Sequence, residues 1–516
     1  MRRITPASVV LLTMALWFTA APAAQAADLD LDHADFHARL GITIYVHVGE
    51  GAGGKSLKAV LTSDKGLEKT IAEKKGLKGV EPVTLILREL PAAKYTLAIS
   101  LSDGRKAVRT WEKPYDGAPR VGVDENNAIC VEGKPFFPVC PWCVTDESEI
   151  KEWSPYINTL HGMGFKKDQW TLDGFRKVLD LAAKHNMKVI GPVRGSYWPR
   201  GGAETGTCYY KNEAGKKVKE KIADHVAMAE YVEVLKNHPA LLLWNWHDEP
   251  ELDNGDNCNP PEEVRKWTLL AHEHDSQHPV MLNTGGKFAR PMDNWAIAHI
   301  KRYTYEFNGI PGPQKVLLAD VISQDYYPVE SGNDPNYPGT FETMCTSMDR
   351  MVQWNRNLTA FLACVETCDI RADGDAPPTP AELRLICWGN IIHGARGLTW
   401  FHYFNPTPKE NFAEMARFLK QITALTPAVC AAKYEGDIEK KETADGRVDF
   451  MATELDGQIY VFAANVLRKA TKATFTLDFA AKKVEVVDEN RTVAAKGKTF
   501  TDSFEPLAVH IYRISK

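Results

Sequence analysis

The segment His238–Glu251, HPALLLWNWHDEPE, carries five consecutive apolar residues (ALLLW) ahead of an acidic pair and a proline. In the segment before it, apolar residues recur at helical spacing, so the order of elements is a helix, an Asn-His-Pro turn, a strand and an acidic loop. We therefore expect a buried strand that delivers Glu249 to a pocket. The alternative is that Asp248 and Glu249 only begin the next helix, whose first turn favours negative charge. The flanking Trp246 and His247 favour a pocket.

Strand-like and helical segments alternate from residue 136 to about residue 428, which is the pattern of βα units around a parallel sheet. One helix start is marked at Thr379–Glu382 (TPAE) by an N-cap, an N1 proline and a capping-box glutamate. Eight strands are expected, at residues 136–142, 164–168, 187–193, 240–247, 280–283, 320–327, 359–366 and 397–404. Eight βα units predict a (β/α)8 TIM barrel, which we assign to residues 126–430.

The segments on either side of the barrel have a different sequence pattern. Residues 27–125 and 431–516 alternate short strand-like runs with turns, such as the Asp103-Gly104 turn. Each segment is predicted to form a β-sandwich, immunoglobulin-like in the first case. The predicted fold class is thus α/β, a TIM barrel flanked by N-terminal and C-terminal β-sandwich domains. Whether these domains bind a ligand or only brace the barrel is left open.

The first 26 residues have the three zones of a secretory signal, namely Arg2 and Arg3, an apolar run, and small residues at Ala24–Ala26. We expect cleavage before Ala27 and an exported chain, either periplasmic or extracellular; an uncleaved membrane anchor is the alternative. No later segment approaches the roughly 20 unbroken apolar residues of a membrane span. The formal charge of −5 gives no sign of binding to nucleic acid or to an anionic membrane.

All ten cysteines lie beyond the signal segment. They are too sparse for a disulfide scaffold, although export makes disulfides possible. Cys208 and Cys258 are the preferred pair because both are expected in polar loops after successive strands. Cys140-x-x-Cys143 resembles half of a zinc or redox motif, but it has no second pair and no histidine at ligand spacing. No cofactor is expected, because the chain has neither a dinucleotide fingerprint nor a P-loop, and it lacks the nucleophile elbow of serine hydrolases.

Two glutamates end barrel strands: Glu249 ends the fourth, and Glu366, in FLACVETCDI, ends the seventh. The carboxyl ends of barrel strands share one face, so both side chains should reach one cleft. Hydrolysis of an acetal linkage needs one protonated carboxyl to assist the leaving oxygen and one ionised carboxylate to attack or stabilise the sugar cation. We expect a raised pKa for Glu249, which Trp244 and Trp246 should desolvate, and an ionised Glu366 among polar partners.

With these two positions the barrel resembles the glycoside hydrolases of clan A, in which strand four carries the acid/base and strand seven the nucleophile. More narrowly, HPALLLWNWHDEPE, HPVMLN, DYYP, and PTPAELR followed by HGARGLTWFHYF resemble a bacterial group of exported hydrolases with DEP at the acid/base position. The resemblance implies a retaining hydrolase of a β-linked oligo- or polysaccharide, with Glu249 as acid/base and Glu366 as nucleophile. Asp248 departs from the pattern, because most clan members have an asparagine there that holds the sugar 2-hydroxyl.

Further residues at strand ends are expected to contact the substrate. They are Trp142, Arg194, Trp246, His247, Asp248, Asp325, Tyr326, Trp400 and His402. Arg194 would replace the clan's arginine near strand two, which has no clear counterpart here. Tyr326 would donate a hydrogen bond to the nucleophile, and Trp400 and Trp142 would stack on a sugar ring, although packing roles are the alternative for these aromatic residues.

His272-Glu273-His274 superficially suggests a metal pair. It lies at a helix end before the fifth strand, away from the face that houses barrel chemistry, and no metal is expected there. Two other classes of protein stay open. A non-catalytic carbohydrate-binding or scaffold protein on a decayed barrel predicts binding without cleavage. A metal-dependent hydrolase predicts that chelators abolish activity. The oligomeric state is not indicated.

Overall fold

The computed structural model describes residues 29–142, 144, 146–161, 172–191, 207–211, 217–221, 224–251, 260–292, 295–307, 310, 315–330, 339–370, 376–402 and 406–516. For residues 207–211, 217–221, 224–227, 246–247 and 295 the description covers the backbone only. The predicted signal segment, Arg194, Cys143, and the predicted pairing of Cys208 with Cys258 lie outside what is described. Along the described chain, no helix combines the length and apolar character needed to cross a membrane.

Eight parallel strands form the central sheet of the molecule. They are β11 (Val139–Pro141), β12 (Thr159–His161), β13 (Lys188–Ile190), β16 (Leu241–Asp248), β17 (Val280–Gly285), β18 (Val321–Asp325), β19 (Ala360–Glu366) and β20 (Ala395–Phe401). Their spatial order is β11-β20-β19-β18-β17-β16-β13-β12. The amide of Asn158, just before β12, donates to the carbonyl of Val139 in β11 at 3.0 Å, which joins the two ends of this order. The predicted TIM barrel is confirmed.

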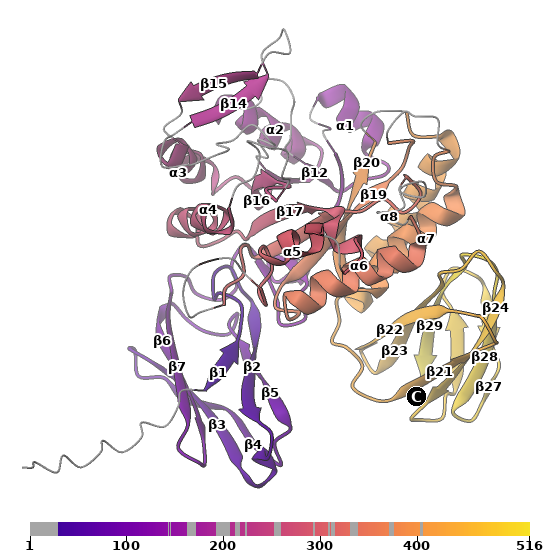
Figure 1. The fold of residues 1–516 in the computed structure, drawn as a ribbon, viewed down its shortest axis with the longest axis horizontal. Coiled ribbons are helices and arrows are strands. Elements are labelled where there is room, and N and C mark those ends of the chain that lie inside the picture. Colours follow the sequence, from indigo (N-terminus) through magenta and orange to yellow (C-terminus); the bar gives the residue numbers. More distant parts are fainter. Residues whose placement is uncertain are drawn as a thin grey trace, which may run out of the picture.

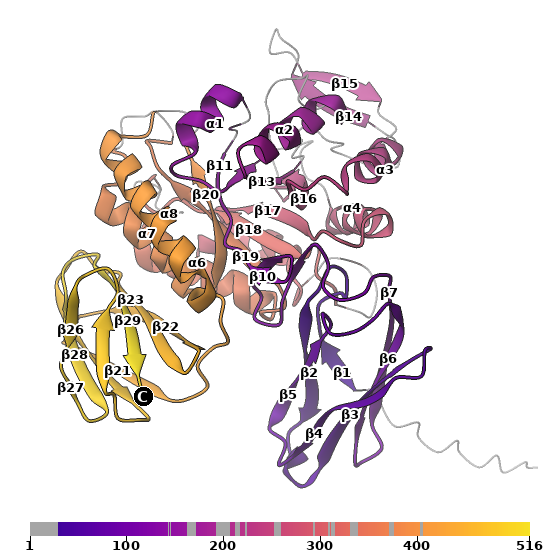
Figure 2. The same ribbon diagram turned by 180° about the vertical axis from the view of Figure 1, so that it is seen from behind.

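Helices alternate with these strands and surround the barrel (Figures 1 and 2). They are α1 (Glu147–Trp153), α2 (Leu172–Lys184), α3 (Asp224–Leu235), α4 (Pro261–His274), α5 (Trp295–Lys301), α6 (Phe341–Trp354), α7 (Pro380–Ile392) and α8 (Lys409–Val429). The capping box predicted at the start of α7 is present. Thr379 Oγ1 accepts from the Glu382 amide at 3.3 Å, and Glu382 Oε2 accepts from the Thr379 amide at 2.7 Å.

One predicted strand was wrong. The second barrel strand is Thr159–His161 rather than residues 164–168, which lie outside the described residues. The segment 164–168 is too polar for a strand buried on both faces, whereas all three residues of β12 are buried. The other seven strands overlap their predicted ranges.

The barrel interior is apolar at the amino-terminal ends of the strands. A short hairpin, β8 (Val121–Val123) and β9 (Ile129–Val131), with β10 (Lys134–Pro135) beside it, packs on residues at the starts of the barrel strands. These interior residues include Cys140, Ile190, Leu242, Met281, Val321, Ala360 and Leu362. The hairpin therefore closes the amino-terminal end of the barrel.

The interior becomes polar toward the carboxyl ends of the strands. Side chains alternate along a strand, so the inward positions that follow Met281 and Val321 are Asn283 and Ser323, and then Gly285 and Asp325. All four residues are buried. Polar groups inside a barrel at this end, rather than at the closed end, mark the place where chemistry is expected.

The N-terminal domain has two antiparallel sheets. One contains β1 (Asp30–Asp32), β2 (Gly41–Gly49) and β5 (Gly79–Ile86); the other contains β4 (Glu68–Lys75), β3 (Ser56–Ser63), β6 (Ala93–Leu101) and β7 (Lys106–Lys113). An ion pair of 2.6 Å between Asp35 and Arg265 joins this domain to helix α4. Figures 1 and 2 show it in indigo, against the barrel at a different place from the C-terminal domain.

The C-terminal domain also has two antiparallel sheets. One contains β21 (Ile438–Glu442), β24 (Thr471–Leu477), β28 (Thr499–Phe504) and β27 (Ala495–Lys496). The other contains β22 (Val448–Leu455), β23 (Gln458–Asn465), β29 (Val509–Ser515), β25 (Lys483–Val486) and β26 (Arg491–Val493). Their facing side chains share one core, in which Phe475 and Phe500 meet Tyr512. Both flanking domains thus have the predicted sandwich architecture. A separate hairpin, β14 (Thr207–Lys211) and β15 (Lys217–Lys221), lies between β13 and α3 in the chain.

Candidate active site

Glu249 follows the last residue of β16, where the chain leaves the barrel. Its φ is +44°, in the left-handed region that non-glycine residues rarely adopt. The backbone is held there by a hydrogen bond of 2.9 Å from the Glu249 amide to the carbonyl of Asn283 in β17. Such a conformation costs on the order of 1–3 kcal/mol and persists at sites where it aims a side chain. This residue is therefore a strand-end carboxyl, and not an ordinary member of a first helical turn.

Gly285, at the end of β17, makes room for that carboxyl. A Cβ added at Gly285 would lie 2.8 Å from Glu249 Oε1 and 3.1 Å from Glu251 Oε1. The Gly285 amide donates to Glu251 Oε1 at 2.5 Å, and the Lys287 ammonium donates to the Glu251 carbonyl. The two glutamates of the DEPE sequence therefore both reach β17, one on each side of Pro250.

Asn283 links two further carboxylates in the barrel interior. Its Nδ2 donates to Asp248 Oδ1 at 2.9 Å and to Asp325 Oδ1 at 3.0 Å. Among the described residues, its own Oδ1 is buried without a hydrogen-bond partner, as is Glu251 Oε2. Buried polar atoms in proteins are nearly always paired, so these atoms are open to water or to a bound molecule.

Burial and neighbouring negative charges raise the pKa of three of these carboxyls. Burial, and then the charges of Asp325, Asp248 and Glu251, raise the pKa of Glu249 well above its ordinary value, against the opposing charge of Lys287. Burial and Asp248 raise the pKa of Asp325 to about 7. Burial raises the pKa of Glu251 to about 6. The predicted rise for Glu249 is confirmed, although Trp244 does not supply it, because its indole points to Asp275 at 2.7 Å.

Aromatic side chains from other strands line the same end of the barrel. Trp142, after β11, stacks on His161 at 4.6 Å between ring centroids and lies 5.9 Å from Phe401. Phe401 in turn lies 5.2 Å from the ring of Tyr327. The Tyr327 hydroxyl is buried and has no hydrogen-bond partner in the described part of the chain, and the negative charges of Asp325 and Glu249 are among the causes that raise its pKa. Tyr327 therefore joins the aromatic residues to the carboxyls.

His161 is a further buried polar residue of this group. It is fully buried, neither ring nitrogen has a hydrogen-bond partner among the described residues, and burial lowers its pKa to about 3. The imidazole is therefore neutral at physiological pH. A buried neutral imidazole offers one donor and one acceptor to a molecule that enters the barrel mouth.

Glu366 lies in a different environment from Glu249. Its two carboxyl oxygens accept from the amides of Val329 and Glu330 at 2.7 and 2.9 Å, so it ties the end of β19 to the loop after β18. The expectation that it stays ionised was wrong, because burial raises its pKa to about 8 against those two amides, with further contributions from the charges of Glu330 and Glu382. Glu249 is not among the charges that act most strongly on it.

Three other residues with predicted substrate contacts face elsewhere. Trp400 is fully buried, its ring lies 5.7 Å from Phe418 of α8, and its indole donates to the Tyr156 carbonyl at 3.0 Å. Its neighbour Thr399 contacts Cys140 inside the barrel, so Trp400 must point outward. The prediction of a sugar platform at Trp400 was wrong, and the inward aromatic residue of β20 is Phe401.

Tyr326 is also turned away from the carboxyl cluster. It is buried, and the groups that act on its hydroxyl are Thr340 and Thr343 at the start of α6, together with the more distant charge of Glu366. His402 packs on Trp153 of α1, at 4.1 Å between ring centroids, and burial lowers its pKa to about 4. The neighbouring Tyr327, and not Tyr326, faces the cluster of Asp325 and Glu249.

Asp248, Asp325 and Trp142 are the predicted contact residues that the structure brings to the neighbourhood of Glu249. The side chains of Trp246 and His247, and all of Arg194, lie outside the described residues. Sequence reasoning missed a second set of residues: Glu251, Asn283, Gly285, His161 and Tyr327. The first three had a signal, because HDEPE and HPVMLNTGG both end expected strands in polar residues and glycine. His161 had none, since its strand was placed elsewhere.

Comparisons with known proteins bear on the fold. No protein-family model matches the chain, and no curated protein matches it by sequence. Among solved structures, a cyclomaltodextrinase matches 94% of this chain and 98% of its own, with a TM-score of 0.50 and 10% identity. An alpha-galactosidase/melibiase from Bacteroides fragilis has a TM-score of 0.48 at 10% identity, over 95% of this chain and 99% of its own. The chain has the fold of TIM-barrel glycoside hydrolases. At this identity the likeness concerns architecture alone.

Proposed function

We propose that this protein is a glycoside hydrolase whose general acid is Glu249. The observation that carries the proposal is a carboxyl that a left-handed backbone aims at the carboxyl end of a barrel strand, in one buried cluster with a second carboxyl, Asp325. Burial and neighbouring charges raise the pKa of Glu249 well above its ordinary value, and they raise the pKa of Asp325 to about 7. Acetal hydrolysis requires one carboxyl that stays protonated to assist the leaving oxygen and one that ionises.

The second carboxyl of the reaction is better assigned to Asp325 than to Glu366. The negative charge of Asp325 is among the causes that raise the pKa of Glu249, and Asp325 shares Asn283 with Asp248. Both oxygens of Glu366 are occupied by backbone amides. The assignment of Glu366 as nucleophile stays a prediction from family resemblance. In the mechanism that we favour, Glu249 donates its proton to the leaving oxygen while Asp325, once ionised, attacks the anomeric carbon or activates water.

The substrate that we propose is a β-linked oligo- or polysaccharide. Trp142, Phe401 and Tyr327 give an aromatic lining suited to the apolar face of a pyranose ring. Asn283 Oδ1, His161 and the Tyr327 hydroxyl supply buried polar atoms that have no hydrogen-bond partner among the described residues and can pair with sugar hydroxyls. The predicted signal segment supports export to the periplasm or the exterior, where polysaccharide substrates occur.

The test is the hydrolysis of a panel of aryl β-glycosides by the wild type, Glu249→Gln, Asp325→Asn and Glu366→Gln. We expect Glu249→Gln to lose about 100-fold or more with poor leaving groups, and much less with a dinitrophenol leaving group, which needs no protonation. Asp325→Asn should be inactive on both kinds of substrate. Full activity of Glu249→Gln on poor leaving groups would end the proposal.

The same panel separates the competing functions. Sugar binding without cleavage of any glycoside would favour the non-catalytic scaffold, and activity that a chelator abolishes would favour a metal-dependent hydrolase. If Glu366→Gln is inactive and Asp325→Asn is active, Glu366 is the nucleophile. NMR identifies the anomer that is released first. It distinguishes retention of configuration, which we propose from the clan resemblance, from inversion.

A further inference from the structure

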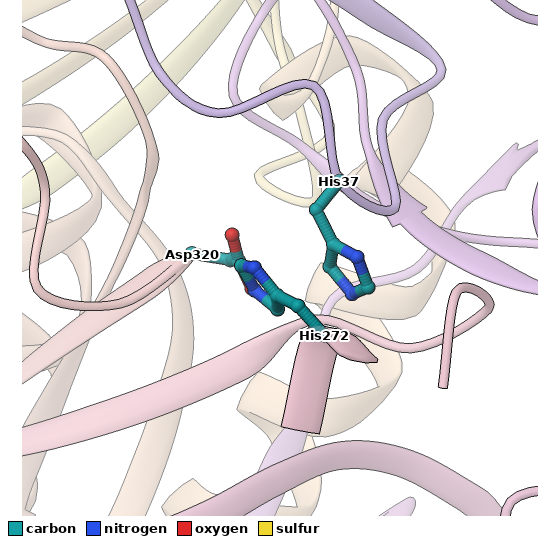
Figure 3. Close-up of side chains that lie close together, drawn as sticks. All are labelled: His37, His272 and Asp320. Atoms are coloured by element: carbon teal, nitrogen blue, oxygen red, sulfur yellow. The ribbon is translucent and has the colours of Figure 1, made fainter. Parts of the chain in front are cut away.

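A second group of chemically capable side chains lies at the opposite end of the barrel, where the N-terminal domain meets it. His37 comes from the segment between β1 and β2, His272 from the last turn of α4, and Asp320 from the residue just before β18 (Figure 3). One potential ligand atom from each lies within 4.8 Å of the others. His272 Nε2 is 2.8 Å from Asp320 Oδ2, and the rings of His37 and His272 stack at 3.6 Å.

We propose that His37, His272 and Asp320 form a transition-metal site of the zinc type that fastens the N-terminal domain to the barrel. Two imidazoles and one carboxylate are a ligand set that zinc accepts, with a water molecule in the fourth position. The water would come from the adjoining cavity of about 380 Å³, whose lining includes both histidines. The site would be structural, because it lies away from the carboxyl ends of the strands.

The protonation state of His37 suits a cation. A metal-binding imidazole must be neutral. Burial is the largest cause that lowers the pKa of His37 to about 4.

The surrounding contacts orient the ligands. His37 Nε2 is 3.1 Å from the carbonyl of His278, to which it donates when that nitrogen is protonated, and Nδ1 then carries the lone pair. The amide of Val280 donates to Asp320 Oδ2 at 2.8 Å. The contact of the His37 ring with a carbonyl is of the kind that fixes the tautomer of a metal-binding histidine.

Two features define which metal fits and what must move. Two imidazoles and one carboxylate favour metals that prefer nitrogen ligands over Mg²⁺ and Ca²⁺, which bind through oxygen. In a tetrahedral zinc site neighbouring ligand atoms are about 3.3 Å apart. The three ligand atoms lie within 4.8 Å of one another, and the His37 ring must turn out of its stack on His272 before both imidazoles can direct a lone pair at one ion.

A comparable cluster against the C-terminal domain lacks these properties. Cys345, His393 and Asp449 are equally close together. However, His393 contacts Asp349 at 2.7 Å and Asp449 at 3.2 Å, and these two carboxylates outweigh burial to raise its pKa to about 12. A protonated imidazole has no lone pair for a metal. That cluster is an ion-pair contact between domains.

The test is calorimetric titration of the dialysed full-length protein with Zn²⁺ at pH 7.5, together with the visible absorption of a Co²⁺ complex. We expect one ion per chain, visible bands of low-symmetry four-coordinate Co²⁺, and a raised unfolding midpoint. His37→Phe keeps a ring on His272 but removes a ligand, and it should weaken binding by about tenfold or more. Asp320→Asn should do the same.

Two matched controls identify the site. His33→Ala removes a histidine that lines the same cavity but contacts Arg109, and His274→Ala removes the other histidine of the His-Glu-His sequence, which contacts Glu233 instead. Both controls should bind as tightly as the wild type. Absence of stoichiometric binding to the wild type, or unchanged binding to His37→Phe, would overturn the proposal. None of these measurements depends on glycosidase activity.

Discussion

Replacement of Asp325 by asparagine should make this protein more stable at neutral pH, while it removes the proposed activity. Asp325 is 9% exposed, and burial with the charge of Asp248 raises its pKa from 3.8 to about 7. Between those two pH values the unfolded chain ionises this carboxyl and the folded chain does not. The free energy of unfolding of the wild type therefore falls as pH rises through this window and levels off above pH 7.

The magnitude follows from the size of the pKa rise. Each pKa unit corresponds to about 1.36 kcal/mol, so a rise from 3.8 to about 7 costs the wild type about 4 kcal/mol at pH 8. Asparagine has the same shape, and its Oδ1 can still accept from Asn283, but it has no charge to bury. Asp325→Asn should thus match the wild type at pH 4 and exceed it by about 4 kcal/mol at pH 8.

Urea unfolding followed by tryptophan fluorescence at pH 4, 5, 6, 7 and 8 measures this difference. Glu366→Gln is the control, because its carboxyl is also buried with a raised pKa but accepts two backbone amides. The side-chain nitrogen of glutamine cannot accept a hydrogen bond from a backbone amide. The free energy of unfolding of this variant should therefore fall by about 1–3 kcal/mol at pH 5, where ionisation contributes little. An Asp325→Asn variant that is no more stable than the wild type at pH 8, or a difference that does not change with pH, would refute the reasoning.

Three further outcomes are expected. Gly285→Ala should lower kcat by about 100-fold with little change in folding, because the added methyl displaces the Glu249 carboxyl 2.8 Å away, and steady-state kinetics on an aryl glycoside checks this. Trp400→Ala should cost about 3–5 kcal/mol in urea unfolding, since the side chain is fully buried against a helix; an effect on KM alone would contradict that placement. His393→Gln should lower the free energy of unfolding at pH 7, because it removes the charged contact with Asp449. The difference from the wild type should shrink as pH rises toward 12 and the wild-type imidazole loses its proton, and thermal unfolding at several pH values measures this.

Much of the architecture was predictable because it depends on local patterns. The apolar run before Glu249, the capping box at Thr379 and the alternation of strands with helices each act over a few residues, and they predicted the barrel and both sandwiches. The prediction of the second strand failed because its three buried residues, Thr159–His161, are too few to show a periodic pattern of hydrophobic residues.

The candidate site was predictable only in part. Glu249 and Asp325 lie at strand ends, which a strand pattern locates along the chain. The direction of a side chain depends on a single-residue register, and a shift of one residue moves it to the other face of the strand. Trp400 was therefore chosen where Phe401 points inward, and Tyr326 where Tyr327 does.

The amino-acid sequence by itself determined which elements form and which strand end carries the acidic group, because hydrophobic periodicity and turn residues act locally. Only the tertiary structure decided which carboxyls meet. Asn283 joins Asp248 to Asp325, and amides of a neighbouring loop bind Glu366. Likewise His272 meets His37, which is distant in sequence, and not His274 beside it. The physical reason is that a pKa or a ligand set depends on distances in space, which chain closure and register establish after the local patterns are satisfied.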